Sequence, residues 1–307
     1  MKIYKSLIIV IIIGLLILPH FASAQDSDCI CCSYNSLKYR DTYKDIFPKD
    51  QIKEQGILEV VIYNKSKDST YTEMKFKFDK EGSISTRIEY YNGKPILIYE
   101  FKRDLTGNII QSSQSYIDSN EMKDNFFPTE IVDFIYDSKN RLIMSKKRDA
   151  KGNIVSDNQS QYTKNEYDDL NRITKKTIFS YFSNDQSYSM KTKYEYNDNS
   201  FSANFTTNYN GKRWLKGNKT FDNSWRVVNN RSTGIGNNPA FFEELFEYDN
   251  QGRIVKFQSI SKGNYADECP EDGNYSDFYF YGSRGLLERI THSYNDVVCN
   301  LRFEYSK

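Results

Sequence analysis

One short motif returns along this chain and constrains its fold more than any other feature. The motif is an aromatic residue, Asp, two variable residues, Gly or Asn, a basic or polar residue, and then Ile or Leu. The clearest copies cover residues 136–142, 167–173 and 248–254, and weaker copies begin at Phe78, Phe221 and Tyr281. Internal similarity of this kind indicates a repeat architecture.

The chemistry of the motif is that of a hairpin turn. Asp favours the first position of a type I turn, where its carboxylate accepts hydrogen bonds from the amides of the turn. Gly or Asn three residues later tolerates the left-handed conformation that closes such a hairpin with a bulge. We therefore assign structural turn roles to Tyr136, Asp137, Tyr167, Asp168, Tyr248, Asp249, Gly252 and Arg253.

The segments between the turns have the pattern of β-strands. Met74, Phe76 and Phe78 alternate with charged residues, so one face of that strand is apolar. Residues 48–55 form the one fair helix candidate, with Pro48 near its start and Gly56 as its stop. The expected fold is all-β, with antiparallel hairpin repeats forming an extended, twisted or curled sheet over residues 71–307. Residues 25–70 are assigned as a lead-in segment that carries a cysteine cluster.

The motif resembles the signature of the YD-repeat (Rhs-like) family, which is Tyr-Asp, two residues, Gly, Arg, and then Leu or Ile. Residues 248–254 match it at each position, and the resemblance covers roughly residues 71–307. It implies long antiparallel sheets that spiral into shells or open sheets. The chain lacks the Asp-Pro-rich core motif and has no room for a toxin domain, so it resembles a small secreted bacterial member. Such members are often labelled as sugar-binding.

Residues 1–24 have the features of a secretory signal peptide. Lys2 and Lys5 precede an apolar run from Leu7 to Leu18, and small residues at 22–24 fit a cleavage site. The run is shorter than the roughly 20 residues that a spanning helix needs. We expect an exported protein, periplasmic, at the cell surface or secreted, with no stable membrane insertion after cleavage.

The cysteines suggest disulfides, which an oxidising compartment permits. Either the amino-terminal cluster is bonded to Cys269 or Cys299, or Cys269 is paired with Cys299. Because the number of cysteines is odd, one thiol stays free or forms a disulfide between two chains. A zinc site is disfavoured because the amino-terminal cysteines are too closely spaced. The candidates are Cys29, Cys31, Cys32, Cys269 and Cys299.

Few residues favour catalysis or metal binding. The chain has two His residues, and His292, which lies beyond the signal, falls in an alternating strand pattern. No nucleophile motif accompanies it. The acidic segment 267–274 does not match a calcium loop. We therefore predict no enzyme activity, no metal and no cofactor.

Aromatic residues beside turns are the best candidates for ligand contact. Trp214 and Trp225 both lie next to turns, and an indole can stack on a sugar ring. Packing across strands is the competing role for such residues in β proteins. Arg141, Arg172 and Arg253 recur just after the turns, where a row of basic groups blocks edge association or binds an anion.

The chain has 42 basic and 41 acidic side chains and a formal net charge of +1, which argues against nucleic-acid binding. We predict a secreted, non-catalytic β-repeat protein that presents a binding or scaffolding surface at the cell exterior, to a glycan or a cell-surface protein. One alternative is a carbohydrate-binding protein. The second is a hydrolase acting on polysaccharide, which needs two converging carboxylates.

Overall fold

A computed structural model describes residues 46–65, 70–91, 93–117, 130–149, 160–181, 187–235, 241–262, 274–294 and 297–307. These contain helix α4 (Lys49–Glu54), the short 3-10 helix η1 (Asp198–Ser200) and 18 strands. The strands are β1 (Glu59–Lys65), β2 (Thr70–Phe78), β3 (Ile84–Tyr91), β4 (Lys94–Arg103), β5 (Ile109–Tyr116), β6 (Glu130–Tyr136), β7 (Leu142–Asp149), β8 (Ser160–Tyr167), β9 (Ile173–Tyr181), β10 (Ser187–Asn197), β11 (Ser202–Tyr209), β12 (Lys212–Phe221), β13 (Val227–Gly234), β14 (Phe241–Tyr248), β15 (Ile254–Lys262), β16 (Tyr275–Tyr281), β17 (Leu287–Tyr294) and β18 (Val297–Ser306).

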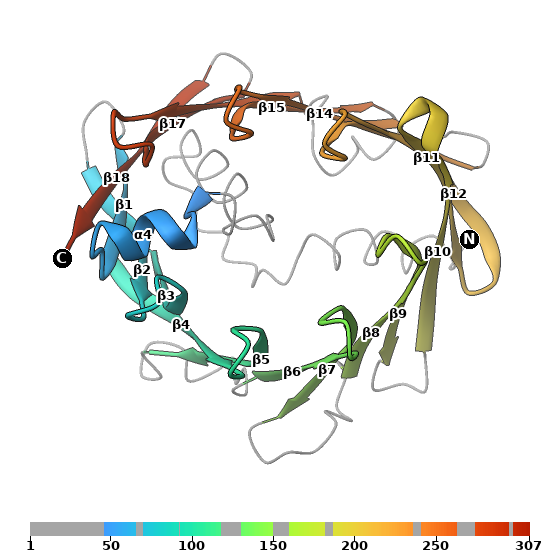
Figure 1. Ribbon diagram of the computed structural model, residues 1–307, viewed down its shortest axis with the longest axis horizontal. Helices are drawn as coiled ribbons and strands as arrows, with labels where there is room; N and C mark the ends of the chain where they lie inside the picture. The colour runs from blue at the N-terminus through green and yellow to red at the C-terminus, as the bar shows by residue number, and fades with distance from the viewer. Residues whose placement is uncertain are drawn as a thin grey trace, which may run out of the picture.

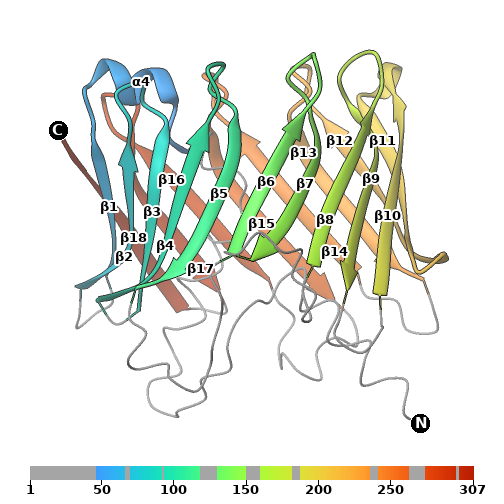
Figure 2. The ribbon, with the colours of Figure 1, turned by 90° about the horizontal axis from the view of Figure 1, so that it is seen from below.

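The strands form one closed, antiparallel barrel (Figures 1 and 2). Each strand pairs with the next along the chain, and β1 pairs with β18 from Glu59↔Ser306 to Lys65↔Asn300. The prediction of an all-β, antiparallel hairpin fold is confirmed. The expectation of an extended or curled sheet is wrong, because the pairing of β1 with β18 leaves no open edge. β1 lies in the segment that the sequence analysis assigned to a lead-in.

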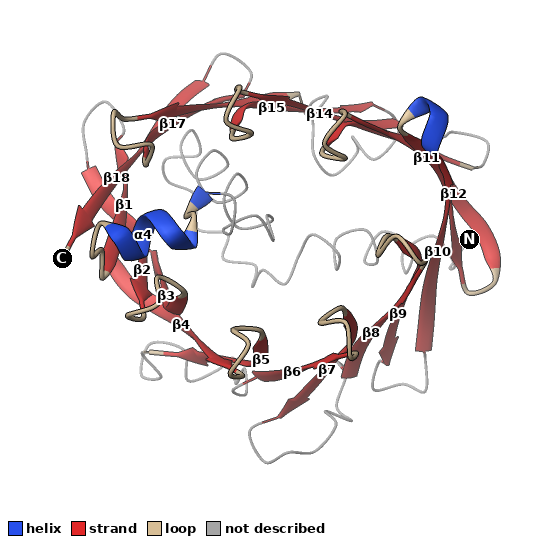
Figure 3. Ribbon diagram, in the orientation of Figure 1, coloured by secondary structure: helices blue, strands red, loops and turns tan. Residues whose placement is uncertain are grey.

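A packed apolar core lies where the chain closes on itself. Phe47, which precedes α4, packs against Phe76 of β2 and Phe303 of β18, with ring centroids 5.0 and 6.2 Å apart. Ile52 of α4 is fully buried in the same cluster. The predicted apolar face of β2 is confirmed, since Met74, Phe76 and Phe78 all belong to this core. The helix lies on the inner side of the ring beside β1 and β2 (Figures 1 and 3).

This core defines the two faces of the wall. The inner wall is the face of the barrel that carries Ile62, Phe76 and Leu301, which α4 helps to bury. Side chains alternate between the two faces along each strand, and residues paired across strands lie on the same face. The pairing register therefore shows, strand by strand, which residues face inward and which face outward. The outer wall is the opposite face, and it begins with the charged residues Glu59 and Lys75.

Helix α4 also lies against the turns of the barrel. Its predicted extent is confirmed, with Pro48 as N-cap, Gln55 as C-cap and Gly56 at φ +63°. A Cβ atom on Gly82, in the β2–β3 turn, would lie 2.3 Å from the carbonyl oxygen of Lys49. Gln55 donates a hydrogen bond to the carbonyl of Arg284 in the β16–β17 turn. The helix therefore links an early turn to a late one at the rim where these turns gather (Figure 2).

Candidate functional site

The repeated turns form one rim of the barrel, and an aspartate organises six of the turns that the structure describes. In the β6–β7 turn, Oδ1 of Asp137 accepts the amides of Lys139 and Arg141, at 2.9 and 3.0 Å. The residue before the basic one adopts a left-handed conformation, as Asn140 does at φ 59°. The same two-amide pattern occurs at Asp79, Asp104, Asp168, Asp222 and Asp249.

These hydrogen bonds set the acidity of the turn carboxyls. The amide of Arg141 is the main cause that lowers the pKa of Asp137, and the Arg141 side chain lowers that pKa further. At Asp104 the hydroxyl of Thr106 is the main cause of a lowered pKa. Asp104 and Asp137 are therefore ionised at neutral pH and act as fixed hydrogen-bond acceptors.

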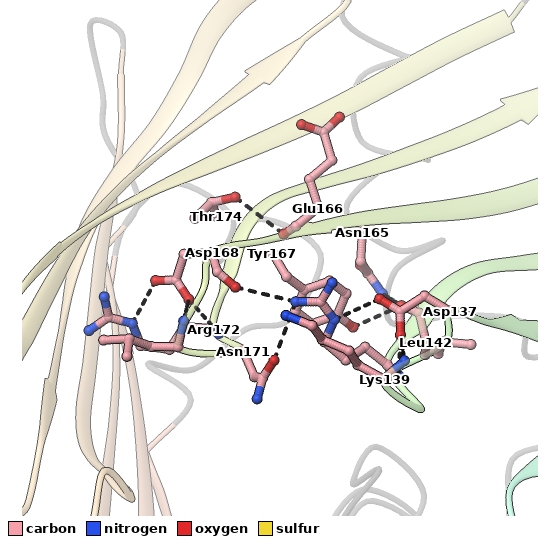
Figure 4. Close-up of polar contacts among 12 residues, drawn as sticks. Asp137, Lys139, Leu142, Asn165, Glu166, Tyr167, Asp168, Asn171, Arg172 and Thr174 are labelled. Atoms are coloured by element: carbon pink, nitrogen blue, oxygen red, sulfur yellow. Dashed lines mark hydrogen bonds and ion pairs between the residues drawn. The ribbon is translucent and has the colours of Figure 1, made fainter.

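Where an arginine follows the turn, it contacts the neighbouring turn or strand, as the residues around Asp137 and Asp168 show (Figure 4). Nε of Arg141 donates to Oδ2 of Asp137 at 2.7 Å, while its Nη1 reaches the carbonyl of Asp168 in the following turn. Its guanidinium also stacks over the ring of Tyr167, 4.9 Å from the centroid. The same stacking joins Arg172 to Tyr196, Arg226 to Tyr248 and Arg253 to Tyr281. The predicted row of arginines exists, but its guanidinium groups are bonded within the rim.

Tyrosines at the ends of strands, just before the turns, connect each of those strands to the preceding strand. The hydroxyl of Tyr167, at the end of β8, donates to the carbonyl of Leu142, the first residue of the preceding strand β7, at 2.8 Å. Equivalent bonds run from Tyr136 to Ile109, Tyr196 to Ile173, Tyr248 to Val227, Tyr281 to Ile254 and Tyr305 to Leu287. Burial raises the pKa of Tyr136, Tyr167 and Tyr196, which keeps these hydroxyls protonated as donors. The motif residues thus form a continuous polar network around the rim.

The two tryptophans proposed as ligand contacts lie apart. Trp225 is in the β12–β13 turn at φ 60°, and its ring packs against Phe201 and Phe221, each 5.3 Å away. Trp214 lies at the other end of β12, with its ring 6.3 Å from that of Tyr209. Because β12 separates them, they do not form one binding face, although a role for either alone stays a prediction.

The inner wall contains a His–Asp pair that the sequence analysis missed. Nδ1 of His292 lies 2.6 Å from Oδ1 of Asp277, and the two residues are directly opposite each other on β17 and β16. The ring of Tyr275 lies 5.2 Å from that of His292. His292 is 3% exposed and Asp277 is fully buried. The sequence held a weak signal for this pair, since both polar residues occupy apolar-face positions of alternating strands.

In the part of the chain that the structure describes, no disulfide supports the predicted pairings. Cys299 of β18 is a buried thiol, and the residue opposite it on β17 is His292, not a cysteine. The other candidates, Cys29, Cys31, Cys32 and Cys269, lie outside the described residues, as do the signal peptide and most of the acidic segment 267–274.

Further ion pairs lie on the inner wall, away from the apolar core. Nζ of Lys147 is 2.5 Å from Oε1 of Glu130, and Nη2 of Arg87 is 2.8 Å from Oε1 of Glu89. Burial lowers the pKa of Lys219, which the nearby Glu244 partly opposes. Charges in such positions are stable only with close partners.

The outer wall carries charged residues on several strands. Pairs of opposite charge link neighbouring strands, as in Lys75 with Glu59 at 3.1 Å and Lys256 with Glu247 at 2.9 Å. Other charged groups stand between them, such as Arg302 at the middle of β18. In the described part of the chain, no cluster of His, Cys, Asp and Glu could hold a metal ion. None of the helices described there is long and apolar enough to cross a membrane.

Comparison with known proteins gives weak likenesses. No family model and no curated protein matches the chain. A porin-like protein from Bacteroides uniformis is 6% identical, with 81% of this chain and 98% of that chain covered and a TM-score of 0.38. A porin-like protein from Bacteroides vulgatus is 10% identical, with 81% and 99% covered and a TM-score of 0.36. A structure described as TcdB2-TccC3-TEV is 10% identical, with 76% of this chain and 13% of that chain covered and a TM-score of 0.25.

The predicted membership of the YD-repeat family is wrong. No family model matches the chain, and the sheet closes as a barrel of 18 strands. The physical reason is that the motif encodes a turn: Asp, a left-handed residue and Arg serve any hairpin of this geometry. The class that the structure defines is a closed, antiparallel β-barrel.

Proposed function

We propose that this protein is a non-catalytic binding scaffold that works in water outside the cytoplasm. The observation that carries the proposal is the charged outer wall. A barrel that spans a membrane needs an apolar outer band about 25 Å tall, and a Lys or Arg at its middle costs about 2–4 kcal/mol. Here Lys164, Lys193 and Arg302 occupy central positions of their strands on the outer wall.

The interlocked rim supports a scaffolding role. The turns at Asp137, Asp168 and Asp249 are bonded internally by Asp and joined to a neighbouring turn by Arg, and Tyr hydroxyls bond adjacent strands beside them. Neighbouring hairpins are therefore held at fixed positions. Rigid elements of this kind hold a binding surface in one geometry and lower the entropy lost on binding. The export signal predicted at residues 1–24 supports a location where such a surface meets extracellular partners.

The buried His–Asp pair is compatible with a non-catalytic role. A general base has to reach a proton of the substrate, within about 3.2 Å or through one water molecule. His292 is almost completely covered, and Asp277 and Tyr275 pack against it. We therefore assign the pair to the packing of the inner wall.

The test is whether the mature chain, residues 25–307, needs a membrane. We expect it to purify without detergent as a monodisperse, β-rich protein and to stay at the bottom of a liposome flotation gradient. A matched variant that replaces Lys164, Lys193 and Arg302 by Leu should become prone to aggregation. Recovery of the unaltered chain only in detergent, or its flotation with liposomes, would overturn the proposal in favour of a membrane-inserted barrel.

A further inference from the structure

Lysines gather on one sector of the outer wall, from β7 to β12. The strand register places them on the outward face, opposite inward residues such as Asn165 and Thr207. This lysine face comprises Lys146, Lys164, Lys175, Lys191, Lys193 and Lys216. All are exposed except the half-buried Lys175.

Acidic residues do not neutralise this sector. Glu166 is bonded to Lys175 at 2.7 Å, and Glu195 is the other outward carboxylate of β8–β12. The chain as a whole is nearly neutral, so a local excess of lysine is a property of this face. A surface of one sign attracts partners of the opposite sign and raises their rate of association.

The centre of the lysine face has a defined geometry. Thr177 of β9 lies directly opposite Lys164 of β8 on one side and Lys191 of β10 on the other. Thr177 is only 5% exposed, so it forms the floor between two exposed lysines. Adjacent strands are about 4.8 Å apart, which puts the two lysine backbones about 10 Å apart. Both ammonium groups can reach a single carboxylate or sulfate placed over Thr177.

A stacked pair of rings borders this floor. Tyr162 of β8 and Phe179 of β9 have ring centroids 4.3 Å apart and an interplanar angle of 22°. Lys146 lies opposite Tyr162 on β7, and the short Ser189 lies opposite Phe179 on β10. Phe179 therefore has no bulky neighbour on that side, where its ring offers an apolar surface next to the lysines.

We propose that the lysine face binds an anionic polysaccharide. Lysine ammonium groups act as hydrated point charges, which suits the separate carboxylates or sulfates of a flexible polymer. Aromatic rings complement the apolar faces of sugar rings. Two arginines of this sector face outward: Arg148, which is bonded to Asp133, and the exposed Arg213 at the start of β12. Lysines therefore outnumber the guanidinium forks that phosphate recognition favours. The partner class rests on the proposed function, because it requires the outer wall to face water.

The test uses polygalacturonate as the probe and the mature chain in two triple variants. One replaces Lys164, Lys191 and Lys193 by Glu. The matched control replaces three exposed outer-wall lysines elsewhere, Lys65, Lys77 and Lys262, by Glu. We expect saturable binding that weakens at least about tenfold in the first variant and within about twofold in the control, since close charges govern binding more than net charge.

A second variant separates ring contact from charge. Phe179→Leu keeps every lysine and should weaken polygalacturonate binding about threefold or more, because the sugar loses an aromatic contact. Neutral dextran should not bind.

Three results would overturn the proposal. The first is an equal loss of polygalacturonate affinity in both triple variants. The second is the absence of saturable polygalacturonate binding by the unaltered chain. The third is tighter binding of single-stranded DNA than of polygalacturonate. Liposome flotation of the same samples separates this failure from that of the proposed function. A chain that stays out of the lipid yet binds no polyanion refutes only the polysaccharide partner.

Discussion

Two halves of the barrel share the same turns but differ in how their inner walls are stabilised. In the closing half, around β1, β2, β17 and β18, the inner wall is apolar and α4 packs on it. Its fully buried side chains include Val60, Ile62, Phe76, Leu287, Ile290 and Leu301. In the far half, from β8 to β12, polar residues alternate with aromatic ones, and Thr192 and Thr207 are hydrogen-bonded at 2.9 Å.

The difference shows that the turn motif and the apolar core have separate roles: the motif forms the hairpin turns, and the core stabilises the wall. The Asp-centred turn and its Arg contacts occur in both halves, at Asp168 and at Asp249. Among the described residues, the apolar core includes Ile52 of α4, which adds a second layer to the closing half. The far half therefore depends more on ring contacts, cross-strand hydrogen bonds and the rim network than on apolar burial.

The largest expected effect comes from removing a core side chain in the closing half. Phe76→Ala should lower the free energy of unfolding by about 3–5 kcal/mol, since it deletes a fully buried ring. Phe205→Ala in the far half should cost less, because Phe205 is 8% exposed and borders Gly217 and Thr207. Urea denaturation measures both, and equal losses would remove the distinction between the halves.

The next effect tests the contact between helix and turn. Gly82→Ala should destabilise by about 2–4 kcal/mol, because the residue is at φ +77° and its Cβ would collide with the backbone of α4. Gly252→Ala is the matched control, at φ +84°, where the Cβ meets only the flexible end of Arg226. The control should cost about 1–2 kcal/mol. Similar unfolding midpoints for the two variants would show that α4 is not held against this turn.

Local chemistry explains what the sequence could predict. The turns at Asp137, Asp168 and Asp249 depend on residues within five positions, so their form follows from the motif. Closure of the barrel depends on β1 meeting β18, and no local pattern encodes that pairing. The Asp277–His292 pair and the lysine face were missed for the same reason. Each arises from register between strands, which places residues distant in sequence side by side.

A smaller loss of stability is expected when a turn aspartate is removed, and it should exceed the loss from removing the acidic residue beside it. Asp168→Ala should cost about 1–3 kcal/mol, because two amides and the Arg172 guanidinium lose their acceptor. Asp169→Ala, at the next and exposed position, should change stability by less than about 0.5 kcal/mol. Thermal unfolding of the pair checks this, and comparable losses would show that the carboxylate network does not stabilise the rim.

The smallest expected effect is a decrease in the free energy of unfolding at low pH, which both halves of the barrel share. Hydrogen bonds lower the pKa of Asp104 and Asp137 in the folded state, so the folded protein binds fewer protons than the unfolded chain. Their contribution is complete above the unfolded pKa of about 3.9 and disappears as the pH falls through the lower folded value. Urea midpoints at pH 7, 4 and 3 should decrease, and Asp137→Asn should flatten that decrease. An unchanged slope in the variant would contradict this assignment.

The pairing of β1 with β18 has a consequence for how the protein is made. All other strand pairs join consecutive segments and can form as hairpins soon after they are synthesised. This one pair must wait until residues 297–306 are available, and until then both strands present unpaired edges. The growing chain is therefore most exposed to aggregation just before its last strand arrives, and chaperones would be needed most during that interval.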